Sequence, residues 1–384
     1  MQDQFISRFP SVESLRRVAA KRLPRFAFEY LIGGANEEIN LGKNIADLQR
    51  VELMPEYLVD VNAPKLAKTI FGHTYAAPFG IAPIGLQGLM WPGAPEILAL
   101  TAHHNNIPFV LSTVTTTSIE SIARITEGHF WFQLYYPAQT SLRLDVLKRA
   151  WDAGCRVLVL LADTPTFGIR YKDVKNGLAM PPKMTALNVF QMMFRPRWVI
   201  HTLRYGTPKF ATLEKYMPKG LNLSQLGKFM NETFDGRLTE SKIREIRDIW
   251  KGKLVIKGMV NEQDTEKAIH WGADGIVVSN HGGRQIDAGE SSINSLQRLV
   301  KKYSGRINIM MDGGIRSGPD IARALAVGAD FVFIGRPFMF GVGALGRRGG
   351  NHTAALFYMQ LKQVMEQLGC QEPTALPKHL IKSS

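Results

Sequence analysis

The sequence predicts a (β/α)8, or TIM, barrel, a closed ring of parallel strands in which a helix follows each strand. From about residue 77, short apolar runs typical of strands alternate eight times with helix-like stretches. The runs are almost continuously apolar, as in parallel sheets that are buried on both faces. Several helix-like stretches end in a glycine suited to a left-handed C-cap just before the next strand, as in Ala153-Gly154-Cys155, Gly272-Ala273-Asp274 and Gly328-Ala329-Asp330.

The predicted strands are Phe79–Ala82, Phe109–Leu111, Phe130–Leu134, Val157–Ala162, Leu254–Lys257, Gly275–Ser279, Ile307–Asp312 and Phe331–Ile334. A doubly wound open sheet is the alternative, but no Gly-x-Gly-x-x-Gly follows the first strand. We expect a single domain over 1–384, with an N-terminal helical segment at 1–70, the barrel at 77–384 and an insertion at about 165–245.

The N-terminal segment contains two predicted helices. The first runs from Ser11 to Lys21, with Ser11 as its N-cap and Glu13 in its first turn. The second runs from Pro24 through Tyr30 and stops near a pair of glycines. From the sequence pattern alone, core packing is the default interpretation of Tyr30.

The insertion separates the fourth and fifth strands by about ninety residues, far more than an ordinary connection. Apolar and aromatic residues are interleaved with Arg and Lys within it. One hypothesis is an active-site lid with its own small core. The other is a segment at about 177–215 that binds a membrane surface, because this composition suits an anionic headgroup layer. The sequence does not favour either hypothesis over the other.

Composition excludes several classes of protein. Half of the net charge of +14 lies in residues 171–220 and no recognition motif accompanies it, which argues against a nucleic-acid-binding protein. Cys155 and Cys370 are far apart and lack metal-ligand spacing, so we expect neither disulfides nor a metal site and a reducing compartment. No long uncharged apolar run and no signal-peptide pattern occur, so we expect a cytoplasmic protein.

The stretch Ser279–Gln285, Ser-Asn-His-Gly-Gly-Arg-Gln, follows the sixth predicted strand. A lone His is more often structural and a lone Arg is usually a solvated charge. However, the carboxyl ends of all strands of a barrel meet at one mouth, where its chemistry takes place. This position favours His281 as a catalytic base and Arg284 as an anchor for a substrate carboxylate.

Glycine-rich turns follow the last two strands, at Asp312–Gly318 and Gly335-Arg336. Free backbone N–H groups beside an Arg at these places are typical of phosphate sites in barrels. Ser112, Gln133 and Lys257 stand at other strand ends, and they suit a flavin-like ring that carries the phosphate.

Together these motifs resemble the FMN-dependent L-2-hydroxy acid dehydrogenase and oxidase family, which includes glycolate oxidase, L-lactate dehydrogenases and (S)-mandelate dehydrogenase. The resemblance extends from Tyr30 through Gly335-Arg336 and implies an FMN-containing barrel that oxidises a 2-hydroxy acid to a 2-keto acid. It implies that His281 is the base and that Asp163 pairs with it to stabilise the imidazolium. Whether this base removes the α-proton or the hydroxyl proton stays open.

The resemblance also implies binding roles. Arg170 and Arg284 would clamp the substrate carboxylate, because a planar guanidinium can bond both oxygens. Tyr30 and Tyr135 would add hydroxyl contacts. The residues implied to bind FMN are Pro83, Ile84, Gly85, Ser112, Gln133, Lys257, Ser279, Asp312, Gly313, Gly314, Arg316, Gly335 and Arg336.

Two departures affect the expected chemistry. Leu161 stands where many members have a Thr near the flavin, so one polar contact to the flavin is missing or replaced. Gly85 stands where the oxidases typically have Ala and the membrane dehydrogenases of the mandelate type have Gly, which favours a quinone over oxygen as electron acceptor. The alternatives are a soluble oxidase that produces hydrogen peroxide and a non-catalytic flavin-binding barrel.

The sequence Phe194-Arg195-Pro196-Arg197-Trp198 looks like the segment associated with membrane binding in mandelate dehydrogenase. We therefore expect a peripheral protein on the cytoplasmic face of the membrane. The resemblance also implies a homo-oligomer, specifically a tetramer.

Overall fold

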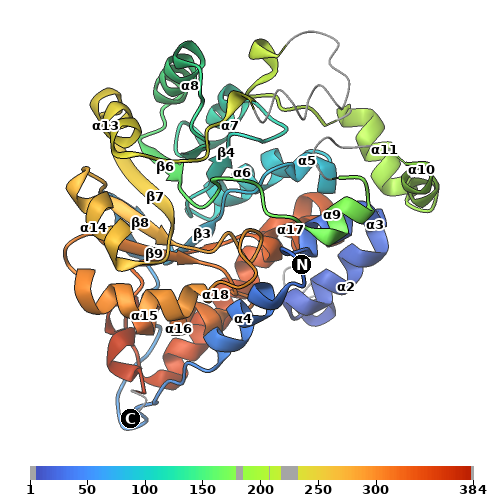
Figure 1. The fold of residues 1–384 in the computed structure, drawn as a ribbon. Coiled ribbons are helices and arrows are strands. Elements are labelled where there is room, and N and C mark those ends of the chain that lie inside the picture. The colour runs from blue at the N-terminus through green and yellow to red at the C-terminus, as the bar shows by residue number, and fades with distance from the viewer. Residues whose placement is uncertain (1–5, 179–184, 207, 218–231, 382–384) are drawn as a thin grey trace.

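The structure is a computed structural model that describes residues 6–178, 185–206, 208–217 and 232–381. Its centre is one eight-stranded parallel sheet with the strand order β3-β10-β9-β8-β7-β6-β5-β4. A parallel bridge between Ile81 and Phe109 joins the two ends of this sheet, so the strands form a ring (Figure 1). The prediction of a barrel is confirmed, and the open sheet is excluded.

The barrel strands lie within three residues of the predicted bounds. They are β3 (Phe79–Ile81), β4 (Val110–Ser112), β5 (Trp131–Leu134), β6 (Val157–Leu161), β7 (Lys253–Met259), β8 (Gly275–Val278), β9 (Asn308–Asp312) and β10 (Phe331–Ile334). The barrel helices are α6 (Ala94–His104), α7 (Ile119–Thr126), α8 (Thr140–Asp152), α13 (Glu240–Ile249), α14 (Glu262–His270), α15 (Ser292–Tyr303), α16 (Gly318–Val327), α17 (Arg336–Leu345) and α18 (Gly349–Leu368).

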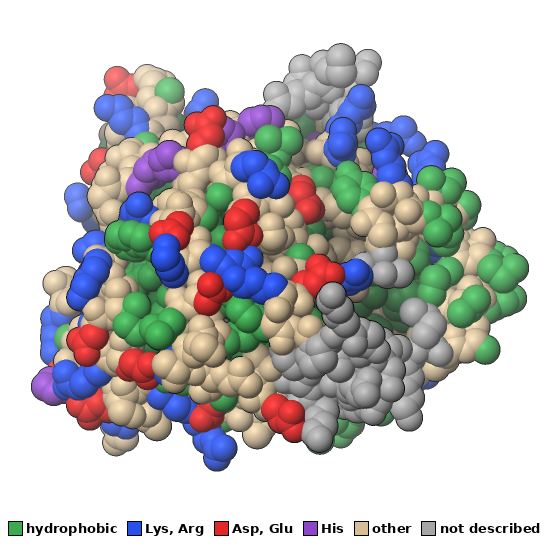
Figure 2. All heavy atoms as spheres, turned by 90° about the horizontal axis from the view of Figure 1, so that it is seen from above, with side chains coloured by type: hydrophobic (Ala, Val, Ile, Leu, Met, Phe, Trp, Pro, Cys, Tyr) green, Lys and Arg blue, Asp and Glu red, His purple; other side chains and the backbone are tan. Residues whose placement is uncertain are grey.

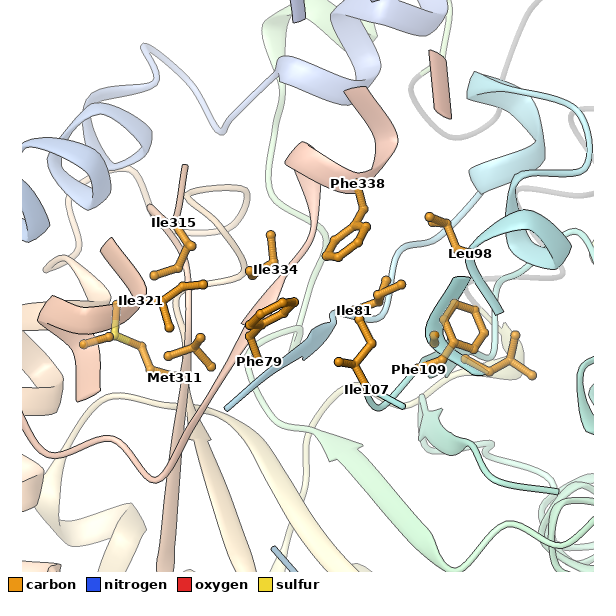
Figure 3. Packing of buried hydrophobic residues seen from close by; sticks show 14 of the residues in the cluster. Phe79, Ile81, Leu98, Ile107, Phe109, Met311, Ile315, Ile321, Ile334 and Phe338 are labelled. Carbon is orange, nitrogen blue, oxygen red and sulfur yellow. The ribbon is translucent and has the colours of Figure 1, made fainter. Parts of the chain in front are cut away.

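The strands are buried on both faces, which explains their continuous apolar sequences. Phe331 and Phe333 of β10 belong to a cluster inside the barrel. Val332 and Ile334 point the other way, into the layer between strands and helices. Figure 3 shows this outer layer, in which Ile334 lies near Phe338 of α17.

An antiparallel hairpin of β1 (Lys68–Ile70) and β2 (His73–Tyr75) was not predicted from the sequence. Ile70 joins the cluster inside the barrel, and Tyr75 packs against that cluster. The Trp131 side chain donates a hydrogen bond to the Tyr75 hydroxyl over 3.0 Å. The hairpin therefore packs on the interior at the amino end of β5, away from the strand ends that carry the polar residues.

The N-terminal segment forms α2 (Val12–Arg22) and α3 (Arg25–Ile32), as predicted, and a further helix, α4 (Ile39–Gln49), that was not predicted. The Ser11 side chain accepts a hydrogen bond from the Ser14 amide and thereby caps α2. In Figure 1, α3 lies beside α9, and α4 lies beside α15 and α16.

Between β6 and β7 the chain forms α9 (Tyr171–Lys175), α10 (Ala186–Met193), α11 (Pro196–Tyr205) and a 3-10 turn (Glu214–Tyr216) before α13. Phe210 and Leu213 form a small separate core with partly buried neighbours, as the lid hypothesis expects. Residues 179–184 and 207 of the proposed membrane segment lie outside the described residues. Within the described ranges, no helix is long and apolar enough to cross a membrane.

Candidate active site

A cavity of about 860 Å³ opens at the carboxyl ends of the barrel strands, within the range of roughly 300–1,000 Å³ typical of ligand sites. Residues at or directly after all eight strands line it. Among the residues predicted for the site, all line the cavity except Asp163 and Ser279. The structure thus brings together residues that lie up to 306 positions apart between Tyr30 and Arg336.

His281 and Asp163 form a hydrogen-bonded pair, with Nδ1 of the imidazole 3.0 Å from Oδ1 of the carboxylate. Burial opposes ionisation of Asp163, but the neighbouring imidazole and Lys257 outweigh this effect, so the pKa of Asp163 is lowered. The carboxylate therefore stays ionised behind the imidazole. With Nδ1 turned toward Asp163, Nε2 is the nitrogen left to exchange a proton with a bound molecule.

The backbone at His281 adopts a left-handed conformation, with φ of +59°. Few residues other than glycine occupy this region, and such strain is concentrated at functional sites. The His281 amide donates to the Ser279 hydroxyl over 3.0 Å. Gly282 and Gly283 continue the turn with φ of +64° and +74°, and a Cβ at Gly283 would lie 2.7 Å from the backbone of Leu41.

One terminal nitrogen of the Arg284 guanidinium is held by hydrogen bonds, and the other is available to a ligand. Its Nη1 donates to the carbonyls of Tyr30 and Gly33 over 2.8 and 2.9 Å. Its Nη2 is buried and has no hydrogen-bond partner among the described residues. Burial and the charge of Arg170 lower the pKa of Arg284, so a carboxylate bound at Nη2 would relieve an unfavourable arrangement.

Asp173, at the start of α9, was missed by the sequence analysis. Its carboxylate lies 2.7 Å from Nε of Arg170 and 4.0 Å from Nη2 of Arg284, and burial raises its pKa. Both guanidinium groups also lie over the ring of Tyr30, at 5.6 and 4.8 Å from its centre. The only available signal was the spacing of Asp173 three residues after Arg170 on a short helix.

Lys257 is buried at the base of the cavity. Its ammonium group lies 2.7 Å from Oδ2 of Asp312 and donates to the Ser279 hydroxyl over 2.7 Å. Ser279 was predicted to contact the cofactor, but it does not line the cavity. Its hydroxyl instead accepts hydrogen bonds from Lys257 and from the His281 amide.

Two further guanidinium groups, those of Arg316 and Arg336, also line the cavity. Burial lowers the pKa of Arg316 to about 10 and holds the pKa of Arg336 well below its usual value. Among the described residues, Arg336 donates to the carbonyls of Leu31, Gly282 and Gly33. An anion between these two cations would offset the cost of burying them.

The register between β7 and β8 shifts at Gly258, and the absence of a side chain there leaves room for Asp163. With φ of +97°, a Cβ at Gly258 would lie 2.5 Å from Cβ of Asp163. We expect Gly258→Ala to displace Asp163 and to lower turnover about tenfold or more, because small displacements in a site have large effects on rate. The measurement is kcat at saturating substrate.

Gly305 provides the matched control for this prediction. Its φ is +78°, but a Cβ there would meet nothing within 4 Å. Gly305→Ala should therefore lower stability by about 1–2 kcal/mol through its backbone alone and leave kcat unchanged. Equal kcat values for Gly258→Ala and the wild type would contradict the role given to this close approach.

A cavity lined by a histidine that is hydrogen-bonded to a carboxylate and by several arginines suits an enzyme that binds anionic ligands. The chain belongs to the FMN-dependent dehydrogenase family, whose model matches residues 19–383. It is 36% identical over 355 residues to an L-lactate dehydrogenase of Bartonella quintana, a match that covers 92% of each chain. An L-lactate dehydrogenase of Acinetobacter baumannii is 35% identical, with 93% of each chain covered.

Solved structures give the same assignment. The monotopic membrane protein (S)-mandelate dehydrogenase is 34% identical with a TM-score of 0.91, over 97% of this chain and 99% of that chain. A mandelate oxidase is 31% identical with a TM-score of 0.82, over 97% of this chain and 98% of that chain. The family and fold implied by the sequence resemblance are therefore confirmed.

The residues present fit FMN. Buried polar atoms without partners, Nε2 of Gln133 and Oδ1 of Asp312, are available to its polar groups. Ser112 donates to Oε1 of Gln133 over 2.9 Å, which leaves the Gln133 amide nitrogen free for a ligand. The guanidinium groups of Arg316 and Arg336 form no salt bridge with a described residue, and they suit the phosphate.

Proposed function

We propose that this protein oxidises an L-2-hydroxy acid, lactate-like or mandelate-like, to the 2-keto acid, with His281 as the base and a quinone as the final electron acceptor. The observation that carries the proposal is that His281, which is hydrogen-bonded to Asp163 behind it, and Arg284, whose Nη2 has no hydrogen-bond partner among the described residues, line the same cavity. A protein that only binds a flavin needs neither a base–carboxylate pair nor an arginine clamp. This argues against the non-catalytic alternative.

We propose the following roles for the residues. Arg284 and Arg170 bind the substrate carboxylate, and the hydroxyl groups of Tyr30 and Tyr135 orient the substrate. Nε2 of His281 takes a proton, and the ionised Asp163 stabilises the imidazolium that forms. Removal of the α-proton and removal of the hydroxyl proton both use this nitrogen.

FMN, when bound, would accept two electrons from the substrate. Lys257, held by Asp312 and Ser279, would provide a buried positive charge in the cofactor site. The residues proposed to hold the cofactor are Pro83, Ile84, Gly85, Ser112, Gln133, Lys257, Asp312, Gly313, Gly314, Arg316, Gly335 and Arg336. We propose that Ser279 supports the cofactor site indirectly, through Lys257.

The choice of acceptor rests on Gly85. A Cβ at this position would lie 2.9 Å from Cγ2 of Val114, so an Ala could enter only if Val114 shifted. We propose that the chain keeps the dehydrogenase pattern and uses a quinone. Steady-state assays with a soluble quinone analogue should give rapid turnover, whereas air alone should give slow turnover with little hydrogen peroxide. Fast peroxide formation would establish the alternative, an oxidase.

We further propose that the protein binds the cytoplasmic face of a membrane through α10 and α11. These helices expose apolar side chains on the surface, where Figure 2 shows apolar groups gathered at the right-hand edge with basic groups nearby. The exposed apolar side chains on α10, on α11 and in the turn between them are Leu187, Val189, Phe190, Met193, Phe194, Ile200, Leu203 and Tyr205.

Three arginines, Arg204, Arg22 and Arg347, lie near His201 on α11. Burial lowers the pKa of His201, and the positive charges of these arginines lower it further. Clustered cations beside exposed apolar side chains suit an anionic lipid surface. The monotopic (S)-mandelate dehydrogenase, with the same fold over 97% of this chain, supports this proposal.

The combined substitution Phe190→Ser, Phe194→Ser and Leu203→Ser is expected to weaken binding to vesicles that contain anionic lipid by tenfold or more. Burial of each large apolar side chain contributes about 1.5–3 kcal/mol. Co-sedimentation with the vesicles measures the effect. Tyr57→Ser with Leu58→Ser is the control, because these side chains are also exposed but lie between α4 and β1. Equal losses in both variants would refute a specific contact through α10 and α11.

We also propose that the chain is one domain and assembles as a homo-tetramer, as the family resemblance implies. Light scattering by the purified holoprotein would test the assembly.

A further inference from the structure

Asn280, directly before the proposed base, is tied to the helix α4 outside the barrel. Its Oδ1 accepts hydrogen bonds from the Gly283 amide over 3.1 Å and from Nδ2 of Asn44 over 2.8 Å. Its Nδ2 donates to Oδ1 of Asn44 over 2.8 Å, to the Glu290 carbonyl over 3.0 Å and to Oδ1 of Asn40. The side chains of Asn280 and Asn44 thus form a reciprocal amide pair.

Asn40 and Asn44 lie four residues apart on one face of α4, and their exposed fractions are 0% and 2%. Burial of polar side chains is unfavourable unless they are hydrogen-bonded. Asn40 donates to the Glu290 carbonyl over 3.2 Å, and Asn44 accepts from the Ser292 amide over 3.0 Å. The buried face of this helix is therefore specialised for polar contacts with the barrel.

The same helix also lies against the glycine turn after β9. A Cβ at Gly314 would lie 2.1 Å from the Asn44 carbonyl oxygen, and a Cβ at Gly313 would lie 3.6 Å from Cγ of Asn44. Asn44 consequently contacts both the loop that carries His281 and the turn that contributes to the proposed cofactor site.

We propose that Asn44 and Asn40, acting through Asn280, are positioning residues that hold His281 in its left-handed conformation. The φ of +59° at His281 is unfavourable for this residue type and persists only if the surrounding contacts impose it. The Gly283 amide bonds both the backbone carbonyl and the side-chain Oδ1 of Asn280 over 3.1 Å and closes the turn across His281, and the amide pair fixes the Asn280 side chain. The inference rests on the proposed role of His281 as the base.

The arginine clamp should not depend on these amides. Arg284 is anchored on the carbonyls of Tyr30 and Gly33, and Arg170 on Asp173. Loss of the amide pair should therefore slow proton removal and leave binding of the carboxylate nearly unchanged.

A control at the same interface separates positioning from general packing. Asn294 on α15 donates to Oδ2 of Asp47 on α4 over 3.1 Å, and no described hydrogen bond joins either residue to the loop at 279–285. Asn294→Ala removes a hydrogen bond between α4 and the barrel without touching the turn at His281.

The test measures anaerobic flavin reduction by L-lactate or L-mandelate, whichever the wild type oxidises faster, in FMN-saturated protein. Asn44→Ala should lower the limiting rate about 10- to 100-fold, as a small displacement of a reacting group does. Asn40→Ala should lower it less, and Asn294→Ala less than twofold. In Asn44→Ala, the Kd of the 2-keto acid product should stay within about threefold of the wild-type value.

Equal limiting rates in Asn44→Ala and Asn294→Ala would overturn the proposal, as would a loss confined to product binding or FMN affinity. If Asn44→Ala does not fold, a rate for Asn40→Ala equal to that of Asn294→Ala would overturn it. Failure of the proposed function is recognised separately, because His281→Gln would then reduce the flavin as fast as the wild type.

Discussion

Replacement of His281 by Gln is expected to lower the rate of anaerobic flavin reduction by about 10²- to 10⁴-fold, the usual contribution of a positioned general base. A Gln side chain can still hydrogen-bond Asp163, but it has no nitrogen that accepts a proton at neutral pH. Stopped-flow absorbance of the holoprotein mixed with substrate measures this rate.

The bound yellow cofactor and the Kd of the 2-keto acid product should change little in His281→Gln, because the arginines and the FMN site are untouched. His270→Gln is the control, since His270 is exposed on α14 away from the cavity lining. A His281→Gln protein that retains more than a tenth of the wild-type rate would show that His281 is not the base.

Replacement of Arg284 by Lys is expected to lower kcat/KM by a factor of roughly 30 to several thousand. Loss of one partner from a buried, hydrogen-bonded charge pair costs about 2–5 kcal/mol, and each 1.4 kcal/mol is a factor of ten. A Lys keeps the charge, but one ammonium group cannot both bond the carbonyls of Tyr30 and Gly33 and bind a carboxylate in a planar fork.

Steady-state kinetics with the best substrate measure the effect of Arg284→Lys, which should raise KM strongly. Arg237→Lys is the matched control, because Arg237 also lines the cavity but its side chain is 80% exposed and lies near Asp235. An Arg284→Lys protein with the KM of Arg237→Lys would exclude Arg284 from the binding of the substrate carboxylate.

The sequence predicted the barrel because each strand can be recognised from its own residues. Each strand is a short apolar run, and β10 is apolar toward the interior at Phe333 and toward the helices at Ile334. The helix α4 was missed because its buried face carries Asn40 and Asn44 as well as Leu48, so it lacks an apolar stripe. The β1–β2 hairpin was missed because its residues are mostly polar and only half-buried.

The mouth of the barrel could be predicted because the chain places unusual polar residues directly after strands, as at Lys257 and Asp312. The roles of Asp173, Gly258 and Asn280 could not be predicted in this way. Each depends on a contact with a distant part of the chain, namely Arg284, Asp163 and Asn44. Such contacts are set by tertiary packing, and the sequence around these residues does not show them.

Anaerobic bleaching of the yellow holoprotein by L-lactate, L-mandelate and glycolate would show whether this cavity oxidises 2-hydroxy acids. We expect at least one of these acids to reduce the FMN fully, with one equivalent of 2-keto acid formed per flavin. Addition of a quinone analogue should then restore the colour faster than air does. If none of the three acids bleached an FMN-loaded protein, the claim that this cavity oxidises 2-hydroxy acids of this kind would be contradicted.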